Sequence, residues 1–336
     1  MRARLILTIG LFGAIASMAS RAATLPQFTV QVIEPPPPYT EFAALKVNNH
    51  GNMIAVGYDA QGLPHYSLWT ADAGSVAIRT PDGTSITSIG GLNGHDVVIG
   101  TYLNGAFYWS QDRGSIAILP APGYSAPHPN GVNDKAIVVG SVVASDGVTL
   151  QSFVWSESNG MQVMTPRKSS EALAINNSSH VAGNLIRKGG LRDEAAIWNG
   201  SKIVPLGFVG AKSATDVAGI NDQDDVAVNA AIDNGSYTQA FIWTAKNGLR
   251  ALSDQVDTTA MGIGKEKQIW GYAPGDPPYS FLWSRESGME NVANLLVPGS
   301  PSISSLTISD MSSDGVLAGW AIYQEVVCAV ILTPIN

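Results

Sequence analysis

The sequence lacks most of the features by which an enzyme or a membrane protein is recognised. It has one cysteine, Cys328, so it contains neither an internal disulfide nor a C-x-x-C pair. Neither G-x-S-x-G nor H-E-x-x-H occurs, which leaves no nucleophile elbow and no zinc-protease motif. After residue 23 no apolar run is long enough to cross a bilayer. These absences favour a binding protein over an enzyme, and neither a metal nor a cofactor is expected.

Charge is also sparse. Only 14% of the residues are charged, and the formal net charge is −8. An acidic chain of this kind disfavours nucleic acid and anionic membrane surfaces as partners. The 35 glycines are typical of a compact β-fold with many turns, and Cys328, within an apolar run, is expected to be buried.

The first 23 residues have the pattern of a secretory signal peptide. Arg2 and Arg4 precede an apolar stretch from Leu5 to Ala16, and small residues around Ala22 suit signal peptidase. A retained membrane anchor is the alternative, but the apolar stretch is shorter than the ~20 residues that a membrane span needs. We therefore expect a secreted or periplasmic protein whose mature part, residues 24–336, is a single domain.

A repeated unit fills the rest of the chain. One landmark is an apolar pair closed by glycine, as in Val98-Ile99-Gly100 and Val181-Ala182-Gly183. The other is the pattern apolar-x-Trp, with tryptophans at 69, 109, 155, 198, 243 and 283 and spacings of 40 to 46 residues. Short β-branched and aromatic runs, separated by Asn, Asp and Gly turns, predict four strands per unit. That length and content are typical of a β-propeller blade.

The two landmarks differ in number, and the difference predicts how the ring closes. The glycine landmark gives seven units, if Asn229 takes the place of glycine in a degenerate copy, whereas the tryptophan landmark gives six. The last unit ends after its third strand, Cys328–Leu332, and the strand Phe28–Ile33 has no unit of its own. We therefore predict an all-β, seven-bladed propeller of four-stranded antiparallel blades, the last blade closed by the N-terminal strand.

The repeat resembles that of the HAF-repeat family of extracellular bacterial proteins. Ala174-Ile175-Asn176 and Gly131-Val132-Asn133 carry the first half of the motif, and Ala106–Trp109 and Ala240–Trp243 carry the second. The sequence departs from the pattern at Asn229 and before Trp198. The resemblance implies secretion and a repeat fold, and it implies no catalytic residues.

In a propeller, the loops between strands 2 and 3 and between strand 4 and the next strand 1 share one face, here called the loop face. The 1–2 and 3–4 turns share the other, the turn face. Basic residues gather in the loops of the fourth unit: Arg167, Lys168, Arg187, Lys188 and Arg192. They predict a site for an acidic sugar, a phosphate or a carboxylate-bearing partner. The alternative is a pair of solvated loops balanced by Glu171, Asp193 and Glu194.

Aromatic residues form a second candidate on the loop face. Tyr58, Tyr102, Tyr272 and Trp320 come just after the closing glycine of strand two. Aromatic side chains at a propeller mouth stack on sugars or anchor peptides, but they also serve as rim packing.

Three acidic residues are the weak catalytic candidates. Glu171, Asp216 and Asp257 occupy related positions in loops between blades and would project toward the central channel. A hydrolase or lyase acting on a polysaccharide or lactone needs them close together.

The first hypothesis is accordingly a secreted or periplasmic recognition module for carbohydrate, an anionic small molecule or protein, acting as a monomer. The channel-mouth hydrolase or lyase is the second hypothesis, and an inert structural propeller is the third.

Overall fold

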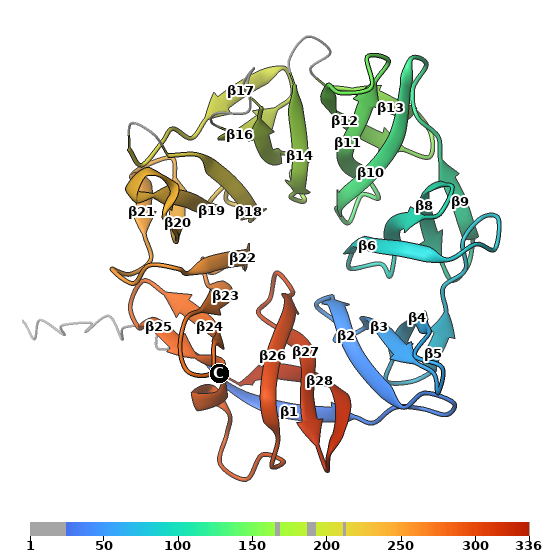
Figure 1. Ribbon diagram of the computed structural model, residues 1–336, viewed down its shortest axis with the longest axis vertical. Helices are drawn as coiled ribbons and strands as arrows, with labels where there is room; N and C mark the ends of the chain where they lie inside the picture. Colours follow the sequence, from blue (N-terminus) through green and yellow to red (C-terminus); the bar gives the residue numbers. More distant parts are fainter. Residues whose placement is uncertain (1–24, 165–168, 187–192, 211–212, 336) are drawn as a thin grey trace, which may run out of the picture.

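The computed structural model describes residues 25–164, 169–186, 193–210 and 213–335, and these form seven four-stranded antiparallel sheets. The sheets stand around an open centre, with each inner strand nearest the axis (Figure 1). This confirms the predicted seven-bladed propeller. No helix in the described part of the chain is long and apolar enough to span a membrane.

In blades 1 to 6 the strands follow the chain from the inside of the blade to the outside, and in blade 7 the outermost strand is β1. Blade 1 consists of β2 (Glu41–Val47), β3 (Met53–Tyr58), β4 (Pro64–Thr70) and β5 (Gly74–Ala77), and blade 2 of β6 (Ile86–Leu92), β7 (Val98–Tyr102), β8 (Gly105–Ser110) and β9 (Gly114–Ile118). Blade 3 consists of β10 (Tyr124–Val132), β11 (Val138–Ala144), β12 (Leu150–Ser156) and β13 (Gly160–Val163), and blade 4 of β14 (Ser170–Ile175), β15 (Val181–Leu185), β16 (Glu194–Asn199) and β17 (Lys202–Pro205). Blade 5 consists of β18 (Thr215–Ile220), β19 (Val226–Ile232), β20 (Tyr237–Thr244) and β21 (Gly248–Ala251), and blade 6 of β22 (Thr259–Ile263), β23 (Ile269–Ala273), β24 (Tyr279–Ser284) and β25 (Gly288–Asn291). Blade 7 consists of β26 (Ser304–Met311), β27 (Leu317–Tyr323), β28 (Val326–Ile335) and β1 (Gln27–Ile33). Two short 3-10 helices, Asp233–Gly235 and Val292–Leu295, interrupt the pattern.

The two ends of the chain close the ring in blade 7. Strand β1 pairs antiparallel with β28, from Gln27 opposite Ile335 to Ile33 opposite Ala329 (Figure 1). Phe28 is 1% exposed in the core between blades 6 and 7, and Cys328 in β28 is fully buried, as expected. Pairing the last strand with the first removes the free sheet edge that an open array would leave.

The cores lie between neighbouring blades. Between blades 1 and 2, for example, Ile54 and Leu68 pack against Phe107 and Trp109. Because each apolar face is buried by the adjacent blade, no blade has a core of its own, and the repeat tryptophans contribute mainly at these interfaces.

The register corrects two repeat positions. In blade 2 the closing glycine, Gly100, pairs with Phe107, which is two residues before the repeat tryptophan Trp109. In blade 5 that position is held by Val228, which pairs with Phe241, rather than by Asn229. In blade 1 it is held by Ala55 rather than Gly57.

Candidate functional site

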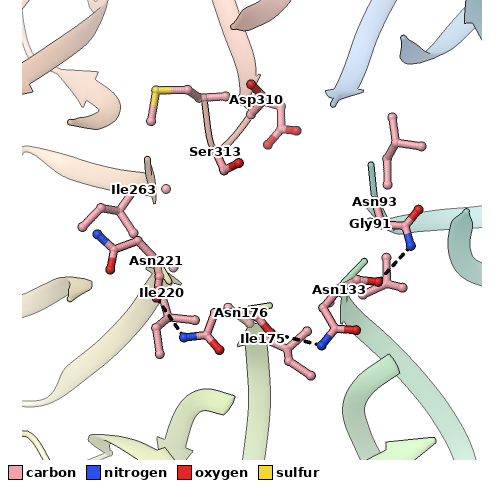
Figure 2. Close-up of a pocket in the computed structure, with 18 of the residues that line it drawn as sticks. Gly91, Asn93, Asn133, Ile175, Asn176, Ile220, Asn221, Ile263, Asp310 and Ser313 are labelled. Carbon is pink, nitrogen blue, oxygen red and sulfur yellow. Dashed lines mark hydrogen bonds between the residues drawn. The ribbon is translucent and has the colours of Figure 1, made fainter. Parts of the chain in front are cut away.

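The central channel has two chemically different ends. All inner strands run in the same direction, so their first residues meet at the loop face and their last residues meet at the turn face. A cavity of about 300 Å³ occupies the turn-face end. Figure 2 shows its lining, with Asn93, Asn133, Asn176 and Asn221 arranged around the axis.

These asparagines connect each blade to the next. The Oδ1 atom of Asn133 accepts hydrogen bonds from the backbone N–H groups of Lys135 and Ile137, at 3.1 and 3.0 Å. Its Nδ2 donates to the carbonyl oxygen of Asn176 in the next blade at 3.0 Å. The same donation runs from Asn48 to Asn93, Asn93 to Asn133, Asn176 to Asn221 and Asn221 to Gly264. Because both ends of each amide are occupied, this ring holds blades together rather than offering groups to a ligand.

Small residues precede the turn asparagines by two positions and let the blades approach. A Cβ atom on Gly131 would lie 3.3 Å from the Cα atom of Ala174, and one on Gly219 would lie 3.3 Å from that of Gly262. The corresponding residues of blades 1 and 7 are Lys46 and Asp310, whose Nζ and Oδ1 atoms are 3.5 Å apart.

The interface between blades 7 and 1, here called the closing seam, therefore carries an ion pair where blades 3 and 4, and blades 5 and 6, have close backbone contact. The Oδ2 atom of Asp310 also accepts the N–H of Val47 at 3.0 Å. Burial raises the pKa of Asp310, against the opposing effect of Lys46. The side chain of Asp310 is 19% exposed.

At the loop-face end, one ladder position carries polar side chains in three neighbouring blades. His128 pairs with Ser141, Glu171 with Asn184, and Asp216 with Asn229. Equivalent register places His128, Glu171 and Asp216 at the same height on β10, β14 and β18. The structure thus brings two of the predicted acidic candidates, Glu171 and Asp216, onto adjacent inner strands.

Asp193 joins them from the strand 2–3 side of blade 4. Its carbonyl oxygen accepts the N–H of Thr215 at 2.9 Å, which fixes it beside Asp216. Its Oδ1 atom is buried and makes no hydrogen bond within the described residues. We call Glu171, Asp193 and Asp216 the carboxylate cluster.

The cluster is electrostatically strained. Burial and then the negative charge of Asp216 raise the pKa of Glu171, whereas His128 opposes them. The same two causes raise the pKa of Asp193. Glu171 is half-buried and Asp216 is exposed, so the two carboxyl groups differ in their access to solvent at the channel mouth.

Asn184 orients the most exposed member. Its Oδ1 accepts the N–H of Val217 at 3.2 Å, and its Nδ2 donates to Oδ1 of Asp216. On the other side, Nδ1 of His128 lies 2.8 Å from Oδ1 of Asn130, whose Nδ2 donates to the carbonyl of Ala172. Together these groups can accept hydrogen bonds from ligand hydroxyls or move a proton.

The third acidic candidate is separate. Asp257 lies in the loop before β22 with a φ of 58°, and it makes no hydrogen bond to Glu171 or Asp216 in the described structure. The basic candidates Arg167, Lys168, Arg187, Lys188 and Arg192 lie outside the described residues.

The four aromatic candidates occupy three different ladder positions. Tyr272 and Trp320 are equivalent, one step after the closing glycine, and Tyr102 lies one step further. Tyr58 is the last residue of β3 and lies three residues after Ala55, which holds the closing-glycine position in blade 1. The hydroxyl of Tyr272 donates to the carbonyl of Ile308 at 2.6 Å, so this residue also joins two blades.

Tyr102 packs on Phe107 with ring centroids 6.4 Å apart. Trp320 is half-buried in β27, paired with Thr307 and Ala329.

Sequence reasoning missed His128 and Asn184, although a signal existed. His128, Glu171 and Asp216 each stand five residues before a turn asparagine, Asn133, Asn176 and Asn221 respectively. Aligning the units on that asparagine would have placed all three at one height.

No family model matches the sequence, and no curated protein matches it. Among solved structures, the fold is similar to virginiamycin B lyase from Staphylococcus aureus, with a TM-score of 0.58 and 14% identity over 92% of this chain and 100% of that chain. A streptogramin B lyase gives 0.55 and 12% over 92% and 98%. The β-propeller domain of the Trilobed protease from Pyrococcus furiosus gives 0.53 and 10% over 88% and 93%.

At such low identities these likenesses establish the fold alone. Within the described residues, no group of three or more His, Cys, Asp or Glu side chains is arranged to hold a metal ion.

Proposed function

We propose that this protein is a secreted or periplasmic carbohydrate-binding propeller whose ligand sits at the loop-face mouth of the channel, over blades 3 to 5. One observation carries the proposal: His128, Glu171 and Asp216 share a ladder position on three adjacent inner strands. Carboxylates accept strong charge-assisted hydrogen bonds from hydroxyl groups, and sugars present several hydroxyls within the span of one ring.

The charge of the cluster selects the ligand. Asp216 is exposed, and Asp193 has a buried oxygen without a hydrogen bond among the described residues. An added anion would meet repulsion from these groups, whereas a neutral or amino sugar would supply donors to them. The signal-peptide pattern of residues 1–23 supports an extracytoplasmic site of action.

A glycan array probed with the mature protein tests this proposal. We expect binding to neutral or amino glycans, lost in Asp216→Asn, because the amide removes charge-assisted acceptors while keeping the side-chain shape. Asp112→Asn, in an exposed turn between β8 and β9, is the matched control and should bind as wild type does. Absence of any glycan signal, or equal binding by both variants, would contradict the proposal.

A second candidate function is acid–base catalysis on a polysaccharide or lactone. Burial and the neighbouring charge of Asp216 raise the pKa of Glu171, and a carboxyl group of raised pKa beside a second carboxyl group is an arrangement that general acid–base catalysis uses. Turnover of a bound glycan with a bell-shaped pH profile, abolished in Glu171→Gln, would support this function. Binding of the glycan without turnover at any pH tested would contradict the catalytic function and retain only the recognition function.

A further inference from the structure

A second cavity, of about 450 Å³, opens on the loop face at blade 1 and its connection to blade 2, and it shares no lining residue with the channel cavity. Its walls are the strand 2–3 side of blade 1 and the connection from β5 to β6, neighbouring elements in Figure 1. The residues that define it here, as the blade 1–2 pocket, are Tyr39, His65, Tyr66, Arg79, Thr84 and Ile86. All belong to the described structure and none is part of the carboxylate cluster.

One wall of this pocket depends on a glycine outside the repeat pattern. A Cβ atom on Gly57 would lie 2.5 Å from the Cδ2 atom of Tyr39, so only glycine allows the ring to rest on β3. The Tyr39 ring stacks beside Phe42 with centroids 6.3 Å apart and lies 5.5 Å from the His65 ring. The glycine thus explains why a half-buried aromatic wall is held in place here.

A short network orients His65 at the pocket. Its Nε2 atom is 2.9 Å from Oδ2 of Asp59. The other carboxylate oxygen of Asp59 accepts the N–H groups of Gln61 and Leu63, both at 2.9 Å. These hydrogen bonds occupy both carboxylate oxygens of Asp59, which thereby holds the His65 ring in place.

The unsatisfied groups in the pocket are donors. Within the described residues, neither the exposed Arg79 guanidinium nor the Tyr66 hydroxyl makes a hydrogen bond. The nearby Asp82 is already occupied by Thr84 and Asn104. The pocket therefore presents an aromatic wall, an oriented imidazole, a hydroxyl and one free positive charge.

We propose that the blade 1–2 pocket binds an acidic sugar unit, a pyranose ring bearing a carboxylate. The carboxylate pairs with Arg79, the sugar ring packs against Tyr39 and Tyr66, which line the pocket from the two faces of blade 1, and ring hydroxyls meet His65 and the Tyr66 hydroxyl. This site goes beyond the proposed channel-mouth function and differs from it in charge: the carboxylate cluster suits neutral or amino sugars, and the pocket suits anionic ones.

Isothermal titration calorimetry of the full mature protein tests whether the pocket binds an acidic sugar. The acidic probe is a short oligogalacturonate, and a neutral oligosaccharide of equal length serves as the comparison. We expect the acidic probe to bind at least about tenfold more tightly than the neutral one, because only it pairs with Arg79. Arg79→Gln should weaken the acidic probe by about tenfold or more, and Arg79→Lys should weaken it less, since it keeps the charge but not the planar fork.

Three further variants distinguish binding in the pocket from binding elsewhere on the protein. Arg250→Gln, an exposed arginine on β21, should bind the acidic probe as wild type does. Glu171→Gln should also leave it unchanged, which distinguishes this site from the channel mouth. Tyr66→Phe should weaken binding while preserving the melting temperature. No binding of the acidic probe, equal affinity for the two probes, or equal effects of Arg79→Gln and Arg250→Gln would each overturn the proposal.

Discussion

The turn-face and loop-face ends of the central channel are built from the same strands but differ in how their polar groups are used. At the turn-face end, asparagine recurs in blades 1 to 5, and each side chain is occupied by its own turn and by the next blade. At the loop-face end, the residues five positions earlier differ in almost every blade: Ala43, Ser88, His128, Glu171, Asp216, Thr259 and Thr307. The comparison indicates that repeated residues assemble the ring and that departures from the repeat create a site.

The largest effect is expected from breaking the turn-face ring. Asn133→Ala removes the acceptor of two backbone N–H groups and the donor to the next blade. Each buried group left unsatisfied costs ~1–3 kcal/mol, so the free energy of unfolding should fall by about 3 kcal/mol. Denaturant or thermal unfolding measures the loss. Asn159→Ala, at an exposed 3–4 turn, is the control, with an expected change within ~0.5 kcal/mol; equal effects of the two variants would contradict a structural role for the ring.

A smaller effect is expected at the seam that closes the ring. Asp310→Ala removes the acceptor of the Val47 N–H and leaves Lys46 without its partner. Lys46 is partly exposed and can return to water, so we expect a loss of about 1–2 kcal/mol by the same unfolding measurement. Asp310→Asn retains an acceptor for Val47 and should recover part of it. A neutral result for Asp310→Ala would mean that β1 and β28 alone secure the closure.

The smallest effect is a pH dependence that only the loop-face end should show. The pKa of Glu171 is higher in the folded protein than its ordinary value, so the folded state binds this proton more tightly than the unfolded state does. The stability that this group contributes is fully present at pH values below its ordinary pKa. It is lost as the pH rises through the raised pKa of the folded state. Melting temperatures of wild type and Glu171→Gln should therefore converge near pH 4 and separate toward pH 7, with the variant more stable at the higher pH. A constant difference between pH 4 and pH 7 would argue against strain in the cluster.

The ring was predictable because its signals are local and repeated. The counts of glycine and tryptophan landmarks implied seven blades and closure by Phe28–Ile33, and both are confirmed. The turn asparagines were predicted as turn formers, but their bonds join residues 40 to 45 positions apart, and only the register reveals them. The register also reveals the two shifted repeat positions, Ala55 in blade 1 and Val228 in blade 5. In blade 1, Gly57 makes room for the Tyr39 ring and is not the closing glycine of the repeat.

The candidate site was only partly predictable. Glu171 and Asp216 were singled out as acidic residues near the channel, and the structure places them on adjacent strands. Asp257 has a similar sequence context but lies two residues before the inner strand begins, where the chain has left the ladder. His128 carries no acidic signature, so only its offset from Asn133 connects it to the cluster. Residue type alone therefore identifies candidates, and position relative to the turn asparagine decides among them.

The division of roles between the channel ends is tested most directly by titrating the tightest glycan from the array into wild type, Glu171→Gln and Asp222→Asn. Asp222 lines the turn-face cavity and accepts the N–H of Asn177, a bond that asparagine can retain, so the two variants each remove one carboxylate from opposite ends. We predict that Glu171→Gln weakens binding by about tenfold or more and that Asp222→Asn leaves it unchanged. Weakened binding in Asp222→Asn with wild-type affinity in Glu171→Gln would contradict the account.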